Sequence, residues 1–362
     1  MSGSMSPNTF IYDTNTLIAV VPNLKRAQSF LLDKFFPNVV TADSEFVSID
    51  VDVGMRRMAP FVSPLVEGKL VEQRRIQTNT FKPPYIKDKR APDLRKPVRR
   101  MIGERIGGDL TGAEREMANL TFEMTDQVDI LTRRLEWMAA SALVTASVVI
   151  AGDGFPTVTI NFGRSAALTV ALTGANIWGY TAGFNSDGKD PIPVLSIEGW
   201  QRAILKASGA AATDIVFTST PWLRFLNAEG VQGAIYYPRL GDFPNSINPG
   251  AQIQRGAAYK GRWGQYDLWL YNDWYVDPIT NVETPMIADG TVIMSGPDMM
   301  GTRAFAQVLD PAFNYAALPF APKTWVMEDP AQRLIMMQSS PIVIPSRVNA
   351  CLAATVCPGL FS

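Results

Sequence analysis

The sequence predicts an α+β fold organised around one long helix. Three observations support this prediction: a helical stripe of apolar residues over 111–144, strand-like alternation before and after it, and a strand–helix alternation from about 174 to 300. The chain has 362 residues, which allows two or three structural regions rather than one small domain. Because 47% of its residues are hydrophobic and 19% are charged, it has ample apolar side chains for a core.

The helix over 111–144 is the strongest single signal. Its apolar residues recur at steps of three or four, which is typical of one buried stripe on a helix. The stripe is predicted to consist of Met117, Leu120, Met124, Val128, Leu131, Leu135 and Met138. Thr111 and Glu114 have the spacing of a capping box, and no proline interrupts the stripe. At about 1.5 Å per residue the helix would span roughly 50 Å, which favours a strut over a unit of a bundle.

Before this helix the chain is predicted to be extended. Residues 1–40 hold short apolar pieces separated by prolines and are predicted to form an arm, with one short helix near 24–34. From Glu45 the residues alternate between apolar and polar, which predicts a half-buried strand. Its apolar face carries Val47, Ile49 and Val51. A second extended run over 69–81 completes a long hairpin that has little core of its own.

A basic segment lies between Lys69 and Arg105. Twelve basic and four acidic residues give it a charge of +8, and four prolines keep it extended. Three interpretations remain open: binding of a phosphate backbone, a solvated face, or contact with an acidic surface of an identical neighbour. The candidate acidic residues of that neighbour are Asp43, Glu45, Asp50 and Asp52. A net charge of only −1 for the whole chain favours identical partners over nucleic acid. The predicted inter-subunit contacts are Val47, Ile49, Val51, Arg74, Arg75, Phe81, Lys82, Tyr85, Lys87, Arg90, Arg99 and Arg100.

Beyond the long helix, the pattern predicts short strands and two helices. Strands are predicted at 148–150, 157–162, 168–172, 214–218 and 291–295, with a hairpin at 257–263 and 266–274 that turns through Gly264. Helices are predicted at 196–208, capped by Ser196, and at 221–228, with Pro221 in the first turn. The last strands are predicted at 303–309, 324–328, 334–338 and 349–356.

Residue types that carry catalysis are scarce. Histidine is absent, which removes the commonest general base and the commonest metal ligand. Cys351 and Cys357 are the only cysteines, so the sequence predicts neither a disulfide framework nor a metal site. Glu136 is expected to form a structural ion pair with Arg133 or Arg134 rather than to act as a general acid. We therefore predict no enzyme and no cofactor.

One run resembles a nucleotide-binding motif. The residues GFNSDGK at 183–189 match the first seven positions of a phosphate-binding loop. The eighth position is Asp190, whose charge would repel phosphate, and Pro191 and Pro193 then argue against the helix that should hold the anion. A surface turn is the preferred interpretation.

The chain carries no signal for export or for crossing a membrane. Its first twenty residues lack the basic start and apolar core of a secretory signal. The longest apolar run, 137–151, is too short to span a bilayer. We predict a soluble, cytosolic chain with no membrane contact.

A resemblance to a known family joins several of these features. The run TFKPPYIK at 80–87 resembles the sequence that precedes the long helix in the phage lambda major capsid protein family. The triplet GER at 103–105 and the end of the helix, RRLEW at 133–137, fit the same layout, as does the length of the chain. The resemblance covers about residues 40–180.

The resemblance implies a Hong Kong 97-like capsid fold. Residues 1–40 would be the N-terminal arm and 41–95 the extended loop. The peripheral domain would comprise 96–173 and 301–345, with the spine helix at 111–144, and the axial domain would comprise 174–300 and 346–362. Nothing marks a self-crosslinking Lys–Asn pair, so we predict non-covalent stabilisation.

The implied function is that of a major capsid protein, part of the virion, assembled in the cytoplasm of a host bacterium. Its main partner would be itself, in pentamers and hexamers of an icosahedral shell that contacts double-stranded DNA without reading its sequence. The resemblance also implies a scaffolding protein and a portal, and leaves a decoration protein open. The alternatives are a nanocompartment shell of the encapsulin type, a nucleic-acid-binding protein that uses 69–105, and, third, an enzyme.

Overall fold

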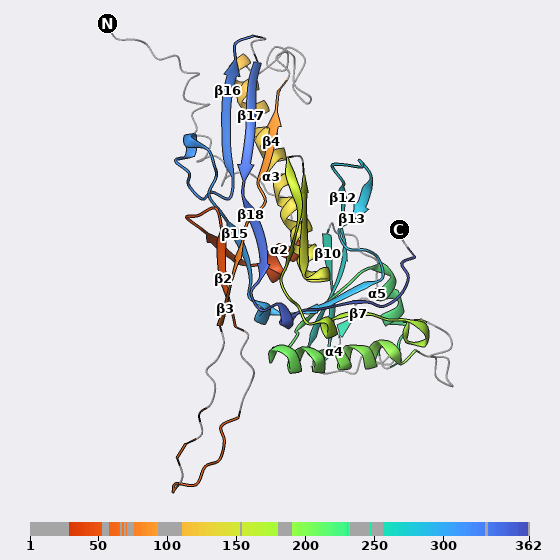
Figure 1. Cartoon of the computed structure of the whole chain (residues 1–362). Helices are drawn as coiled ribbons and strands as arrows, with labels where there is room; N and C mark the ends of the chain where they lie inside the picture. Colours follow the sequence, from red (N-terminus) through yellow and green to blue (C-terminus); the bar gives the residue numbers. More distant parts are fainter. Residues whose placement is uncertain are drawn as a thin grey trace.

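The computed structural model describes residues 29–52, 58–65, 67–68, 70, 76–92, 111–152, 154–179, 190–229, 231, 246–247, 256–329 and 332–360. Within them helices and strands are mixed around one long helix, as predicted (Figure 1). The helices are α2 (Phe30–Phe35), α3 (Gly112–Thr145), α4 (Ile192–Ser208) and α5 (Ser219–Leu226). Figure 1 shows the described residues 58–65, between β2 and β3, lying far from the body of the molecule.

The largest sheet has seven strands in the order β7-β19-β14-β8-β11-β10-β9. Their bounds are β7 Thr169–Ala171, β8 Asp214–Phe217, β9 Ser246–Ile247, β10 Gly256–Trp263, β11 Tyr266–Asn272, β14 Thr291–Ser295 and β19 Leu352–Thr355. β8 is parallel to β11 and antiparallel to β14, and all of its residues are buried. Trp200 of α4 and Phe225 of α5 share a core with Phe217 of β8, so the two helices pack on this sheet. The hairpin predicted to turn through Gly264 is confirmed by β10 and β11.

Two three-stranded sheets surround the long helix. Their orders are β1-β15-β18 and β16-β17-β4. Their bounds are β1 Asn38–Thr41, β4 Ile86–Arg90, β15 Gly301–Phe305, β16 Ala321–Met327, β17 Gln332–Ser339 and β18 Pro341–Pro345. β1 runs parallel to β15, from Asn38 opposite Thr302 to Thr41 opposite Phe305. The early part of the chain is therefore fastened to a strand about 260 residues away.

Three separate hairpins complete the described structure. They are β2 (Val47–Asp52) with β3 (Ile76–Phe81), β5 (Ser147–Gly152) with β6 (Phe155–Asn161), and β12 (Trp274–Val276) with β13 (Glu283–Pro285). The β2–β3 pairing runs from Val47 opposite Phe81 to Asp52 opposite Ile76 and confirms the predicted long hairpin. No helix among the described residues is long and apolar enough to cross a membrane.

The helix α3 joins two separate cores. It has 34 residues, and its first turn is closed by the predicted capping box between Thr111 and Glu114. The first core contains Leu120, Met124, Val128 and Leu131 with Phe320, Ile335 and Met337, and the main core contains Leu135 and Met138. All six of these predicted stripe residues are buried. The prediction for Met117 is wrong: its side chain is 41% exposed, because the first core ends at Leu120.

The described part of the predicted arm belongs to the main core. α2 begins at Phe30, and its buried side chains include Leu31, Leu32 and Phe35. Residues 29–41 are therefore packed against the body through this helix and through β1. Residues 1–28, including the first part (24–28) of the helix expected near 24–34, lie outside the described residues, and the described helix is Phe30–Phe35.

Prolines account for one wrong helix boundary and for one strand that was not predicted. α4 begins at Ile192 with Pro191 as its N-cap, so Ser196 is not the cap. A proline in the first turn of a helix removes only an N–H that has no partner within the helix, so Pro193 is tolerated there. The strand β18 was not predicted, because Pro341 and Pro345 bracket it. Proline is compatible with β18 because this strand lies at the edge of its sheet.

Gly301 provides a sharp test of the packing between α2 and β15. A Cβ atom at this position would overlap the carbonyl oxygen of Phe35 and the ring of Phe36. Both phenylalanines are buried, so neither can move aside easily. We expect Gly301→Ala to lower the free energy of unfolding by roughly 1–3 kcal/mol, as overpacked cores do. The matched control is Gly199→Ala in α4, where nothing lies within 4 Å of the new Cβ. This control should raise stability by about 0.5–1 kcal/mol. Urea unfolding of both variants measures these changes in the free energy of unfolding. Equal stability of the two variants would contradict the close contact between Gly301 and Phe35–Phe36.

Candidate functional site

The root of the extended hairpin is bound to its own chain. Val47 is only 2% exposed and packs in the main core, so its side chain is not presented to a neighbour. Phe81 is half-buried, and its ring lies 5.6 Å from that of Phe162 in an edge-to-face arrangement. Lys82 forms an ion pair of 2.6 Å with Glu45, one of the acidic residues expected to serve a neighbour. Both side chains are largely exposed, so this pair contributes little to stability.

The basic residues near β4 are also held within the chain. β4 pairs with β17, and Arg90 at its end forms ion pairs with Asp88, Glu123 and Asp126. The part of the basic segment at 86–90 is therefore a strand of a sheet rather than a free extension. Lys87 is exposed, and its amino group lies 5.1 Å from the centre of the Tyr85 ring.

Tyr85 belongs to a small buried network. Its hydroxyl donates to the Oε1 atom of Gln338 at 2.8 Å, and the Nε2 atom of Gln338 donates to Asp310 at 2.9 Å. Lys323 forms an ion pair with the same Asp310 at 2.7 Å. Burial raises the pKa of Tyr85. This network fixes the chain that leads from the hairpin into β4.

Several predicted contact residues have side chains outside the described part of the structure. Arg74, Arg75, Arg99 and Arg100 lie outside the described residues, as does the run at 183–189 that resembles a phosphate-binding loop. Ile49 and Val51 belong to β2, but their side chains are not described. Asp190, beside that run, is buried and accepts hydrogen bonds from the backbone N–H groups of Gly179 and Ile192. Its role at this point is to connect two backbone segments.

The sequence reasoning missed the most exposed apolar side chains of the described chain. They lie beyond β2, in the long loop, and are Met58, Phe61, Leu65 and Leu70. Each is almost fully or fully exposed. The sequence carries a signal for them, because apolar residues recur through the segment between the two predicted strands without a strand or helix period. Such side chains concentrated on one projecting loop are typical of an interaction site.

Glu136 joins three parts of the molecule. It lies on α3, and its carboxylate accepts hydrogen bonds from the backbone N–H groups of Leu31 at 2.8 Å and Leu32 at 3.0 Å, in the first turn of α2. The hydroxyl of Tyr271 in β11 donates to it at 3.1 Å. Burial raises the pKa of Glu136 to about 7, against the lowering effect of these three hydrogen bonds. Because these are the first N–H groups of a helix, a carboxylate is well suited to accept from them.

The expected ion pair between Glu136 and Arg133 or Arg134 is therefore wrong. Among the described residues, no ion pair joins this carboxylate to either arginine, and its partners are neutral groups. The guanidinium of Arg134 instead lies 5.3 Å from the centre of the Trp137 ring. Arg134 thereby reaches the rim of a cavity.

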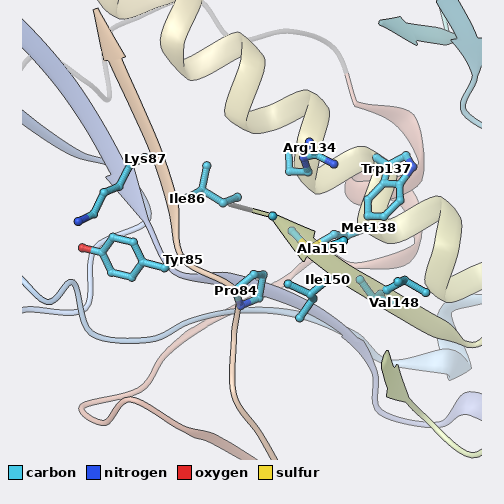
Figure 2. A pocket seen from close by; sticks show the side chains of 12 residues that line it. Pro84, Tyr85, Ile86, Lys87, Arg134, Trp137, Met138, Val148, Ile150 and Ala151 are labelled. Atoms are coloured by element: carbon cyan, nitrogen blue, oxygen red, sulfur yellow. The ribbon is translucent and has the colours of Figure 1, made fainter. Parts of the chain in front are cut away.

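This cavity lies between α3, β5 and the segment before β4. Its volume is about 230 Å³. Figure 2 shows Arg134 and Trp137 on α3 above Ile150 of β5, with Pro84 and Ile86 on the opposite side. A second cavity of about 540 Å³ adjoins it and shares Tyr85 and Lys87. The two form a groove with an apolar floor; its rim carries Lys87 and Arg134, and also the ion pair between Lys82 and Glu45. Within the described ranges, no group of three or more acidic or cysteine side chains is arranged to hold a metal ion.

Comparison with known proteins decides the family. The model of the family described as phage major capsid protein E matches residues 13–356. The chain belongs to this capsid protein family. It is 25% identical to the major capsid protein of Escherichia phage N15 and 24% identical to that of Escherichia phage lambda. Each match spans 338 residues, which are 92% of this chain and 96% of the relative.

A solved structure supports the same fold. The crystal structure of a prophage capsid protein from E. coli CFT073 is 19% identical, covers 95% of this chain and 99% of its own, and superposes with a TM-score of 0.72. A phage-related protein from Bordetella bronchiseptica RB50 superposes with a TM-score of 0.51 at 11% identity, over 97% of this chain and 99% of that one. The fold of this phage major capsid protein E family member is thus Hong Kong 97-like, as expected from the resemblance.

The family also gives the function in outline. The chain is a major capsid protein of a tailed bacteriophage, a structural component of the virion capsid, and it associates with copies of itself in a shell. The nanocompartment and nucleic-acid-binding alternatives are not favoured. In a shell, each subunit meets identical neighbours. The exposed loop and the groove are surface features of such a subunit, and the Glu136 junction lies in its interior.

Proposed function

We propose that copies of this capsid protein form pentamers and hexamers of an icosahedral shell that encloses double-stranded DNA. The observation that supports this proposal is the projecting loop with Met58, Phe61, Leu65 and Leu70. A monomer leaves these side chains in water, whereas a neighbouring copy can cover them. The hydrophobic effect, at about 25 cal/mol per Å² of apolar surface, then favours assembly. The extended loop would bury these apolar side chains on an adjacent subunit.

Further partners follow from this role. A shell built in the cytoplasm of a host bacterium would use a scaffolding protein, a portal and, in some capsids, a decoration protein. Its inner surface would contact the phosphate backbone of packaged DNA without reading bases. The protein would act without catalysis, through contacts between subunits that are non-covalent.

The loop is the place to test this proposal. The double substitution Phe61→Ser and Leu65→Ser removes apolar surface that only a neighbour can cover, so the fold of the subunit should be unchanged. Each lost side chain weakens an interface by about 1.5–3 kcal/mol, and we expect the concentration needed for assembly to rise by roughly tenfold or more. Light scattering and negative-stain electron microscopy of the full-length protein measure this threshold.

The control is Leu195→Ser on α4, which removes an exposed leucine outside the loop. This control should leave the threshold within about twofold of wild type. Shells of normal size and yield from the loop variant, at the same threshold as the control, would refute the role of the loop. Circular dichroism of both variants separates a failure to assemble from a failure to fold.

A further inference from the structure

A small hairpin at the margin of the molecule presents apolar side chains to solvent. Figure 1 shows β12 and β13 projecting away from the seven-stranded sheet. Trp274 and Val276 lie on its outer face, and Ile279, in the turn, is 77% exposed. An isolated two-stranded hairpin is only marginally stable in water. An apolar outer face on such a hairpin therefore indicates a surface that another molecule covers.

The turn of this hairpin is already ordered. The carboxylate of Asp277 accepts hydrogen bonds from the backbone N–H groups of Ile279 at 2.7 Å and Thr280 at 3.3 Å. Asn281 adopts a left-handed conformation with φ of 55°, and its N–H donates to the carbonyl of Asp277 at 2.8 Å. Because the turn is fixed before binding, docking of Ile279 costs little conformational entropy.

The hairpin is also acidic. Between 273 and 285 the chain has Asp273, Asp277 and Glu283 and no lysine or arginine. Glu283 is exposed and is paired across the hairpin with Val276, so both project from the same face. A partner surface should therefore combine an apolar floor with positive charge.

The groove described above has these properties. Lys87 and Arg134 stand at its rim, and among the described residues neither takes part in an ion pair. Its floor includes Trp137, Ile86 and Ile150. At about 230 Å³ the first cavity is smaller than the roughly 300–1,000 Å³ of pockets that hold drug-sized ligands, so it suits one or two side chains.

We propose that Ile279 of one subunit, with its flanking carboxylates, docks in the groove of the next subunit around a ring. This inference rests on the proposed function, because it assigns one contact within a capsomer. Hairpin and groove are different surfaces of the same chain, so their contact is heterologous, and such contacts form a ring when the rotation between neighbours closes. The occupant is a second copy of this chain.

A charge swap tests the contact. Glu283→Lys and Arg134→Glu each place like charges in contact, and each should raise the assembly threshold at least tenfold. The protein that carries both substitutions should assemble to within about threefold of wild type, because the pair is restored with its signs exchanged. The control is the double variant Arg133→Glu with Glu283→Lys. Arg133 lies on the same helix but outside the groove, so this double variant should not rescue assembly. Thermal melting of each unassembled variant reports whether loss of the Arg134–Trp137 contact has disturbed the fold.

A disulfide test does not depend on charge. Ile279→Cys with Val149→Cys, which lines the groove, should give a ladder up to covalent pentamers and hexamers when assembled protein is treated with diamide. Ile279→Cys alone should give no ladder, since Cys351 and Cys357 are buried. Additive defects in the charge swap, or shells without a ladder, would overturn this contact and leave the shell function intact. Wild-type protein that forms no capsomers or shells would instead overturn the proposed function itself.

Discussion

Leu131→Asp is expected to leave the protein insoluble or unable to assemble. Leu131 is 2% exposed in the smaller core, where Phe320, Ile335 and Met337 surround the α3 stripe. An aspartate at this position would be charged, buried and without a partner, which costs several kcal/mol or more. This cost is comparable to the whole stability of a typical domain, about 5–15 kcal/mol. The soluble fraction after expression and the yield of shells by electron microscopy measure the effect.

Ile130→Asp is the matched control for this prediction. Ile130 is the preceding residue on α3 and is 48% exposed, so the same substitution there leaves the charge in water. Both variants carry the same change in net charge, and their changes in helix propensity differ by only a few tenths of a kcal/mol. The control should stay soluble and lose less than about 1 kcal/mol. Normal shells from Leu131→Asp would mean that this side of α3 is not the buried one.

Glu136 is expected to make the stability of the subunit depend on pH. Its pKa is raised from 4.5 to about 7 in the folded chain by burial. The folded state therefore binds a proton more tightly than the unfolded state, and the protonated carboxyl contributes stability. This contribution is complete below about pH 4.5 and is lost as the pH rises through about 7. A shift of this size corresponds to a loss on the order of 3 kcal/mol.

The comparison with Glu136→Gln isolates this titration from the other carboxylates. Glutamine cannot ionise and retains one carbonyl acceptor for the backbone N–H groups of Leu31 and Leu32. The difference in unfolding free energy between wild type and variant should move by on the order of 3 kcal/mol in favour of the variant from pH 4.5 to 7.5. Tyr271→Phe removes a hydrogen bond that lowers the pKa of Glu136, so the midpoint should move to higher pH. A constant difference between wild type and Glu136→Gln across this range would rule out the raised pKa.

The sequence predicted elements that carry their own local signals. The capping box at Thr111 and Glu114, the spacing of the α3 stripe and the alternation in β2 are all properties of neighbouring residues. The capping box marks the start of the helix, the spacing marks its buried face, and the alternation marks the strand. None of these depends on residues far away in the chain. The family resemblance rested on similar local runs at 80–87 and 133–137. These are the features that could be predicted.

The remaining features depend on partners far away in sequence. The bonds from Leu31 and Leu32 to Glu136 join residues more than 100 positions apart, and no local pattern announces them. Met117 continues the spacing of the stripe, yet its side chain is exposed. The residues that pack against α3 reach only as far as Leu120, one turn away from Met117. The groove, likewise, exists only after β4, α3 and β5 have come together. The cations at its rim could not be separated from the other cations of the chain by sequence alone.

The parallel pairing of β1 with β15 has a consequence for how the protein is made. Asn38 donates from its amide to the carbonyl of Gly301, 263 positions later in the chain. A ribosome that adds about 5–20 residues per second needs on the order of tens of seconds to produce this partner. During that interval β1 has no partner strand, so the sheet β1-β15-β18 cannot form. Translation thus delays the completed subunit until the last sixth of the polypeptide is emerging, so a chain still on the ribosome does not yet present the finished surface of a subunit.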